Sequence, residues 1–140
     1  MTEYAGDLTP QEAWELLLSD PAAILVDVRT EAEWRFTGVP DTSETGCEPI
    51  FIEWVNYPEG ARNARFVDQL RDAGMSPGTG APIVFLCRSG QRSIGAAIAA
   101  TAAEMGPAFN ILDGFEGPTD EDGHRGVQGW KAEGLPWRQG

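Results

Sequence analysis

The sequence PIVFLCRSGQRSIG occupies residues 82–95, and the organisation of the whole chain follows from it. Four consecutive apolar residues, Ile83 to Leu86, are of strand-forming types and predict a buried strand. An alanine-rich helix is expected to follow after a short polar loop and to run to about Met105. Cys87 is therefore expected where a strand ends and a helix is about to begin.

This position favours the reactive form of a cysteine. The start of a helix offers unpaired N–H groups and the positive end of the helix dipole, and both stabilise a thiolate. Arg88 and Arg92 add positive charge, and Gly90 lets the backbone curl so that its N–H groups converge on an anion. We interpret Cys87 as an activated nucleophile in an anion-binding loop. The alternative is a structural cysteine that precedes a basic helix start.

The segment Cys87–Ser93, CRSGQRS, resembles the active-site loop of the rhodaneses, the single-domain thiosulfate sulfurtransferases. Four residues separate Cys87 from Arg92. Phosphatases of the Cys-x5-Arg type, some of which share the rhodanese fold, have a loop that is one residue longer. That spacing would need an arginine where this chain has Ser93, so the resemblance implies sulfur chemistry rather than phosphate chemistry.

Other blocks along the chain carry the same resemblance. They are Asp27-Val28-Arg29, Glu33-Trp34 with Gly38, Asp113–Gly117 with Phe115 in place of a glycine, and Gly129–Pro136. The chain departs from the family at Gly38–Thr42, because most members have a histidine after this glycine. This histidine is not the nucleophile, so the departure affects the expected wall of the pocket rather than the chemistry.

The resemblance implies a role for each residue of the site. Cys87 and Arg92 are the predicted catalytic residues, and the residues expected to bind the substrate and the persulfide are Arg88, Ser89, Gly90, Gln91 and Ser93. Asp27 and Arg29 are expected to support the loop, by fixing its arginines or by supplying positive charge. The alternative for these two is a surface ion pair at a strand end, worth roughly 0–1 kcal/mol.

Strands and helices alternate along the sequence. Thr9 to Glu12 form a capping box with proline at the first helical position, so a helix is expected to start at Pro10. Further strands are expected at 23–29, 50–54 and 108–112, and further helices at 30–36 and 61–73. This rhythm predicts an α/β, rhodanese-like three-layer fold with a central, mostly parallel sheet of about five strands flanked by helices. The 140 residues are expected to form a single domain, 1–140.

Composition restricts the classes of function. The chain has 22 acidic and 10 basic residues and a formal net charge of −12, which argues against binding to nucleic acid or to anionic membranes. The two cysteines, Cys47 and Cys87, and the single histidine, His124, have no spacing suited to a metal, and no metal or cofactor is expected. Neither a signal peptide nor a membrane span is recognisable, so we expect a cytoplasmic protein.

Two parts of the sequence, Cys47 and segment 118–127, each allow two interpretations. Cys47 is either a bystander thiol or a group that resolves a persulfide or disulfide at Cys87. The acidic, glycine-rich segment 118–127, which contains His124, is either a solvated loop or a flap that recognises a partner.

The resulting prediction is an enzyme, a thiosulfate sulfurtransferase, that moves sulfane sulfur through a persulfide on Cys87. Its expected partners are a small anionic sulfur donor and a thiol or cyanide acceptor, and a protein acceptor is a further option. One alternative is a noncatalytic or redox-sensing rhodanese module that binds a partner protein. Another is a cysteine-dependent phosphatase or arsenate reductase, which the short loop disfavours.

Overall fold

A five-stranded, fully parallel sheet forms the centre of the computed structural model. The structure describes residues 4–45, 49–55, 63–75, 78, 80–87, 92–112, 114–115, 117, 129–132 and 134–138. The strands lie in the order β1-β6-β5-β2-β4 and comprise Gly6–Leu8 (β1), Ala108–Ile111 (β6), Ile83–Leu86 (β5), Ile24–Asp27 (β2) and Ile50–Phe51 (β4). The predicted α/β fold class, with its mostly parallel sheet of about five strands, is confirmed.

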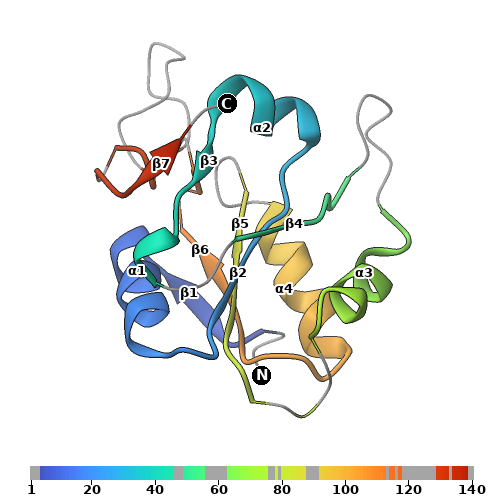
Figure 1. Cartoon of the computed structure of the whole chain (residues 1–140). Helices are drawn as coiled ribbons and strands as arrows, with labels where there is room; N and C mark the ends of the chain where they lie inside the picture. Colours follow the sequence, from blue (N-terminus) through green and yellow to red (C-terminus); the bar gives the residue numbers. More distant parts are fainter. Residues whose placement is uncertain are drawn as a thin grey trace.

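Helices cover both faces of this sheet (Figure 1). Helix α1, Pro10–Ser19, packs on one face, and helices α3, Phe66–Asp72, and α4, Arg92–Ala102, pack on the other. Every residue of β5 is buried, because alternate side chains point to the two faces of a strand and both faces are covered. Val84 and Leu86 lie in the core on the α1 side, whereas Ile83, Phe85 and Cys87 lie on the α4 side.

Two helices begin at the capping boxes of the sequence. Thr9 caps α1, and Thr30 caps α2, Glu31–Thr37. In α2 the Thr30 side chain accepts from the Glu33 N–H, and the Glu33 carboxylate accepts from the Thr30 N–H. This reciprocal cap fixes where the Glu33 side chain lies.

Helix α4 can approach the sheet closely because its core-facing side chains are small. Ala96, Ala97 and Ala100 are fully buried. A Cβ atom placed on Gly95 would lie 2.9 Å from the Trp54 ring, closer than van der Waals contact permits. Glycine in this helix interior is therefore explained by packing, although it costs about 1 kcal/mol in helix propensity relative to alanine.

Some elements differ from the sequence prediction. Helix α3 begins at Phe66, and residues 63–65 of the expected helix 61–73 form a turn instead. Helix α4 ends at Ala102, before Met105. Strand β1, the 3-10 helix η1 at Ser43–Thr45, and the antiparallel pair of β3, Val39–Pro40, and β7, Trp137–Arg138, were not predicted.

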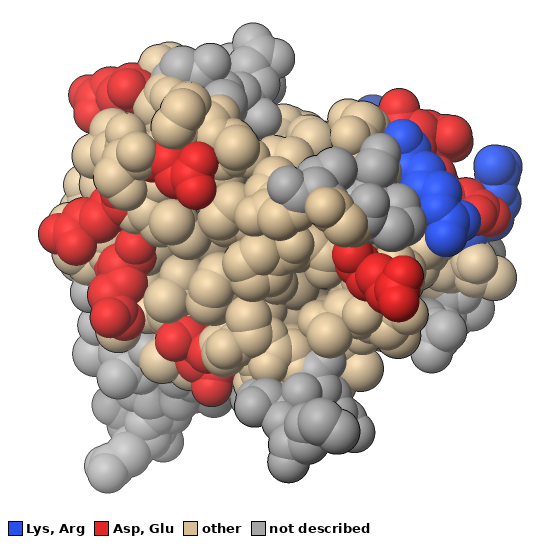
Figure 2. Space-filling view, turned by 90° about the horizontal axis from the view of Figure 1, so that it is seen from below, with Lys and Arg blue, Asp and Glu red and all other residues tan. Residues whose placement is uncertain are grey.

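Acidic side chains are spread over the face of the molecule that lies opposite α2 (Figure 2). Seen from the end opposite α2, Asp and Glu side chains are scattered over the molecule, and Lys and Arg lie only at one side of the view (Figure 2). Within the described residues no helix is long and apolar enough to cross a membrane.

Candidate active site

The predicted site residues Cys87, Asp27 and Arg29 lie at the carboxyl ends of two strands, β5 and β2. These strands are neighbours, and Asp27 is paired in register with Leu86. Cys87 directly follows β5, and the Val28 N–H donates to the Leu86 carbonyl at 2.8 Å. Since the carboxyl ends of parallel strands gather ligands, this edge brings Cys87 and the end of β2 together at the position where chemistry is expected.

Cys87 is held from several sides. Its side chain is buried, at 1% exposure, and its carbonyl accepts from the Phe115 N–H at 2.8 Å. The Ser93 hydroxyl, in the first turn of α4, lies 3.2 Å from the Cys87 sulfur. A hydroxyl at this place can donate to a thiolate or to the charged sulfur of a persulfide, and hydrogen bonds to charged groups are stronger than those between neutral groups.

Ser93 has a second partner that the sequence analysis did not single out. Its hydroxyl makes a short hydrogen bond with the side-chain oxygen of Asn110, in β6. The Asn110 amide nitrogen in turn donates to the Asp7 carboxylate at 3.0 Å. The signal was present in the sequence: Asn110 is a polar residue on the face of β6 that alternation assigns to the apolar core.

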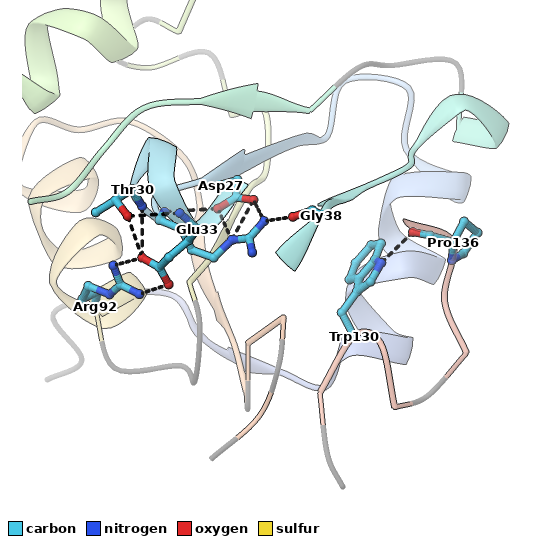
Figure 3. A network of polar contacts seen from close by, with 8 residues as sticks. Asp27, Thr30, Glu33, Gly38, Arg92, Trp130 and Pro136 are labelled. Carbon is cyan, nitrogen blue, oxygen red and sulfur yellow. Dashed lines mark hydrogen bonds and ion pairs between the residues drawn. The ribbon is translucent and has the colours of Figure 1, made fainter. Parts of the chain in front are cut away.

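Arg92 is engaged by a carboxylate from another part of the chain (Figure 3). Its two terminal nitrogens donate to the two carboxylate oxygens of Glu33 at 2.7 and 2.8 Å. Figure 3 shows Glu33 placed between Thr30 and Arg92, so one carboxylate caps α2 and orients the guanidinium. The side chains of Arg92 and Glu33 are only 26% and 18% exposed.

This pairing is visible in the ionisation of both groups. Burial alone raises the pKa of Glu33, but the hydrogen bonds and charge of Arg92, together with the bonds from Thr30, hold that pKa below its usual value. Burial alone lowers the pKa of Arg92, and the hydrogen bonds and charge of Glu33 outweigh it, so the pKa is raised. The negative charges of Cys87 and Asp27 also raise the pKa of Arg92.

Asp27 and Arg29 form an ion pair in which both side chains have no exposed area. The Arg29 Nη2 donates to Asp27 at 2.7 Å and to the Gly38 carbonyl at 2.9 Å, and the guanidinium carbon lies 4.2 Å from the centre of the Phe115 ring. The alternative of a surface ion pair is therefore wrong. The pair supports Phe115, whose N–H holds the Cys87 carbonyl, and its predicted influence on the loop arginines stays a prediction.

The remaining site residues of the prediction lie outside the described part of the chain. These are Arg88, Ser89, Gly90 and Gln91 of the loop, and the same holds for Cys47 and for segment 118–127 with His124. Their predicted roles stay predictions. Among the described residues, no group of three or more His, Cys, Asp or Glu side chains is arranged to hold a metal ion.

The Glu33–Arg92 pair predicts an acid-sensitive part of the stability. Glu33→Gln is expected to lower the free energy of unfolding by about 1–2 kcal/mol near pH 7, because glutamine can still cap α2 but no longer pairs a charge with Arg92. Since the pKa of Glu33 is lowered in the folded state, this contribution is complete above its ordinary value of 4.5 and is lost as pH falls through the lower folded value. Urea unfolding between about pH 7 and about pH 3 measures it.

Glu31→Gln is the matched control, because Glu31 lies on the same helix and pairs with Arg35 at 2.7 Å. Those two side chains are 64% and 74% exposed, so the change should cost no more than about 0.5 kcal/mol at any pH. The free energies of unfolding of the wild type and the Glu33→Gln variant should become equal at the lowest pH of the series. A Glu33→Gln deficit that stayed constant with pH would contradict the ion-pair account.

Comparison with known families assigns the class of this protein. Residues 9–117 match the model of the rhodanese-like domain, so the chain belongs to the rhodanese-like family. The uncharacterized protein RC0915 of Rickettsia conorii is 36% identical over 127 residues, which cover 91% of this chain and 92% of that protein.

Solved structures agree with this assignment. Rv0390 from M. tuberculosis is 57% identical to this chain, with a TM-score of 0.89 and coverage of 98% of this chain and 99% of that one. The polysulfide-sulfur transferase homodimer from Wolinella succinogenes has a TM-score of 0.66 and 22% identity, and the match covers 99% of this chain and 80% of that one. At that identity the second likeness shows the shared fold.

Proposed function

We propose that this protein is a sulfurtransferase that carries sulfane sulfur on Cys87. Membership of the rhodanese-like family supports sulfur transfer in general. The observation that carries the proposal is the position of Cys87: it directly follows the central strand, and a hydroxyl from the first turn of α4 contacts its sulfur. A persulfide is anionic, and donors of this kind stabilise developing negative charge on sulfur in the manner of an oxyanion hole.

The reaction has two halves. The Cys87 thiolate attacks the outer sulfur of thiosulfate, the S–S bond of thiosulfate breaks, and sulfite leaves with the bonding electron pair. The persulfide on Cys87 then delivers its outer sulfur to cyanide, which gives thiocyanate, or to a thiol, which gives a new persulfide. The Cys87 thiolate is restored in either case, so the cycle is of the ping-pong type.

The charges of the site fit an anionic donor. The chain as a whole is strongly negative, so a negative donor has to be attracted by local cations. Arg92, which also pairs with Glu33, and Arg88 are the cations that we propose for this role. Thiosulfate is our proposed donor, and a small thiol, cyanide or a protein thiol is the proposed acceptor.

The test is the intact mass of the purified protein before and after thiosulfate, and again after cyanide. A gain of one sulfur atom on the Cys87 peptide, removed by cyanide with release of thiocyanate, is the expected result. Polysulfide is the second donor to try, because the Wolinella protein is a polysulfide-sulfur transferase. A gain with polysulfide alone would retain the mechanism and replace thiosulfate as donor, whereas no gain with any donor would overturn the proposal.

A further inference from the structure

A line of hydrogen bonds runs from the edge of the sheet to the reactive sulfur. It starts at Asp7 in β1, passes through Asn110 in β6 and Ser93 in α4, and ends at Cys87 after β5. Asp7 and Asn110 are register partners of adjacent strands, which fixes their approach. Four elements of the fold thus contribute to one line of hydrogen bonds that ends at the sulfur. Of its side chains other than Cys87, the proposed mechanism uses only Ser93.

The orientation of the Asn110 amide is set by Asp7. A carboxylate can only accept, so the Asn110 nitrogen must face Asp7 and the Asn110 oxygen must face Ser93. The Ser93 hydroxyl has one proton and two neighbours that accept, the Asn110 oxygen and the Cys87 sulfur. When that proton goes to Asn110, the lone pairs of the Ser93 oxygen are left to face the sulfur.

We infer that Asn110 is a positioning residue that competes with Cys87 for the Ser93 hydroxyl proton and so opposes formation of the thiolate. In the thiol state the Cys87 S–H donates to Ser93, and Ser93 donates to Asn110. When Cys87 loses its proton to solvent, the Ser93 hydroxyl turns to the sulfur, and the Asn110 oxygen loses its hydrogen bond. The inference rests on the proposed function only in taking Cys87 as the nucleophile.

Other charges near the sulfur remain in place when Asn110 is changed. Among the described residues these are Arg92 at the start of α4, Asp27 at the end of β2 and Asp7 in β1. The Phe115 N–H binds the Cys87 carbonyl and not the sulfur. A change at Asn110 therefore alters the hydrogen bonds of Ser93 and Asp7 but removes no charged group.

The test is a pH titration of the thiolate absorbance, taken as the difference between the protein and its Cys87→Ser variant. Asn110→Leu removes the competing acceptor and keeps the branched arrangement of the heavy atoms, and the hydroxyl of Ser93 is then left to the sulfur. The midpoint of the titration is expected about one pH unit lower than in the wild type. An unchanged or higher midpoint would overturn the inference. The titration needs no sulfur donor, so its outcome is independent of whether the protein transfers sulfur.

The decisive control makes the Asn110→Leu substitution in a protein that lacks the Ser93 hydroxyl. In a Ser93→Ala background, Asn110→Leu should leave the midpoint where Ser93→Ala alone puts it, whereas an equal shift in both backgrounds would overturn the inference.

The variant Asp7→Ala tests the same line of hydrogen bonds from an exposed position, and it decides the question if Asn110→Leu does not fold. It frees the amide to turn its nitrogen to Ser93 and also removes a negative charge, so it should lower the midpoint more when Ser93 is present than in the Ser93→Ala background. Tyr4→Phe, which removes another partner of Asp7, should have no effect.

Discussion

The Cys87→Ser variant is expected to lose sulfur transfer by at least about a thousandfold and to take up no sulfur from any donor. A serine hydroxyl is scarcely ionised near neutral pH, and it cannot form the S–S bond on which both half-reactions depend. The fold should survive, because serine is nearly the size of cysteine and Ser93 can hydrogen-bond to the new hydroxyl. We expect the free energy of unfolding to change by no more than about 1 kcal/mol. Thiocyanate release and urea unfolding measure the two quantities.

Cys47→Ser is the matched control, since Cys47 is the second cysteine of the chain. If Cys47 is a bystander, this variant should load sulfur on Cys87 and turn over as the wild type does. A variant that loads sulfur but fails to pass it on would instead assign Cys47 a resolving role. Transfer at the wild-type rate by Cys87→Ser would contradict the mechanism.

The position of the nucleophile could be predicted because its signals are local. An apolar strand, a short loop with glycine and arginine, and an alanine-rich helix are consecutive in the sequence, and each of them acts over a few residues. The parallel sheet followed from the regular alternation of such segments. The structure places Cys87 and Ser93 together, as this junction implies.

The supporting contacts could not be predicted because they join residues that are far apart in the chain. Glu33 precedes Arg92 by 59 positions, and Asp7 precedes Asn110 by 103. Capping already explained Glu33, so nothing in its neighbourhood indicated a second partner. Strand β1 contains glycine and aspartate, which disfavour strands, and it forms because its backbone pairs with β6.

The burial of Arg29 shows where an interpretation from residue type failed. Arginine and aspartate two positions apart at the end of a strand are usually solvated. Here Arg29 has no exposed area, and its guanidinium contacts the Gly38 carbonyl and the Phe115 ring. The family block Asp27-Val28-Arg29 contained the relevant information, but only the fold gave it a physical reason.

That burial predicts a large effect on stability. Asp27→Ala is expected to lower the free energy of unfolding by about 3–5 kcal/mol, because it removes the carboxylate that pairs with the fully buried guanidinium of Arg29. Among the described residues the Gly38 carbonyl and the Phe115 ring also contact this guanidinium, and neither carries a charge. Small domains are typically stable by only about 5–15 kcal/mol, so the variant should be partly unfolded at moderate temperature. Urea unfolding at neutral pH measures the loss.

The double variant Asp27→Ala with Arg29→Met separates the loss of the ion pair from a simple loss of contact. Removing both charges removes the cause of the penalty, so much of the stability should return relative to Asp27→Ala alone. Arg29→Met alone leaves the Asp27 carboxylate buried, although the Arg29 N–H still donates to it at 3.1 Å, and it should be destabilising as well. If the double variant were as unstable as the sum of the two single ones, the pair would act through packing around Phe115. The position of Cys87 would then depend on the shape of these side chains and not on their charge.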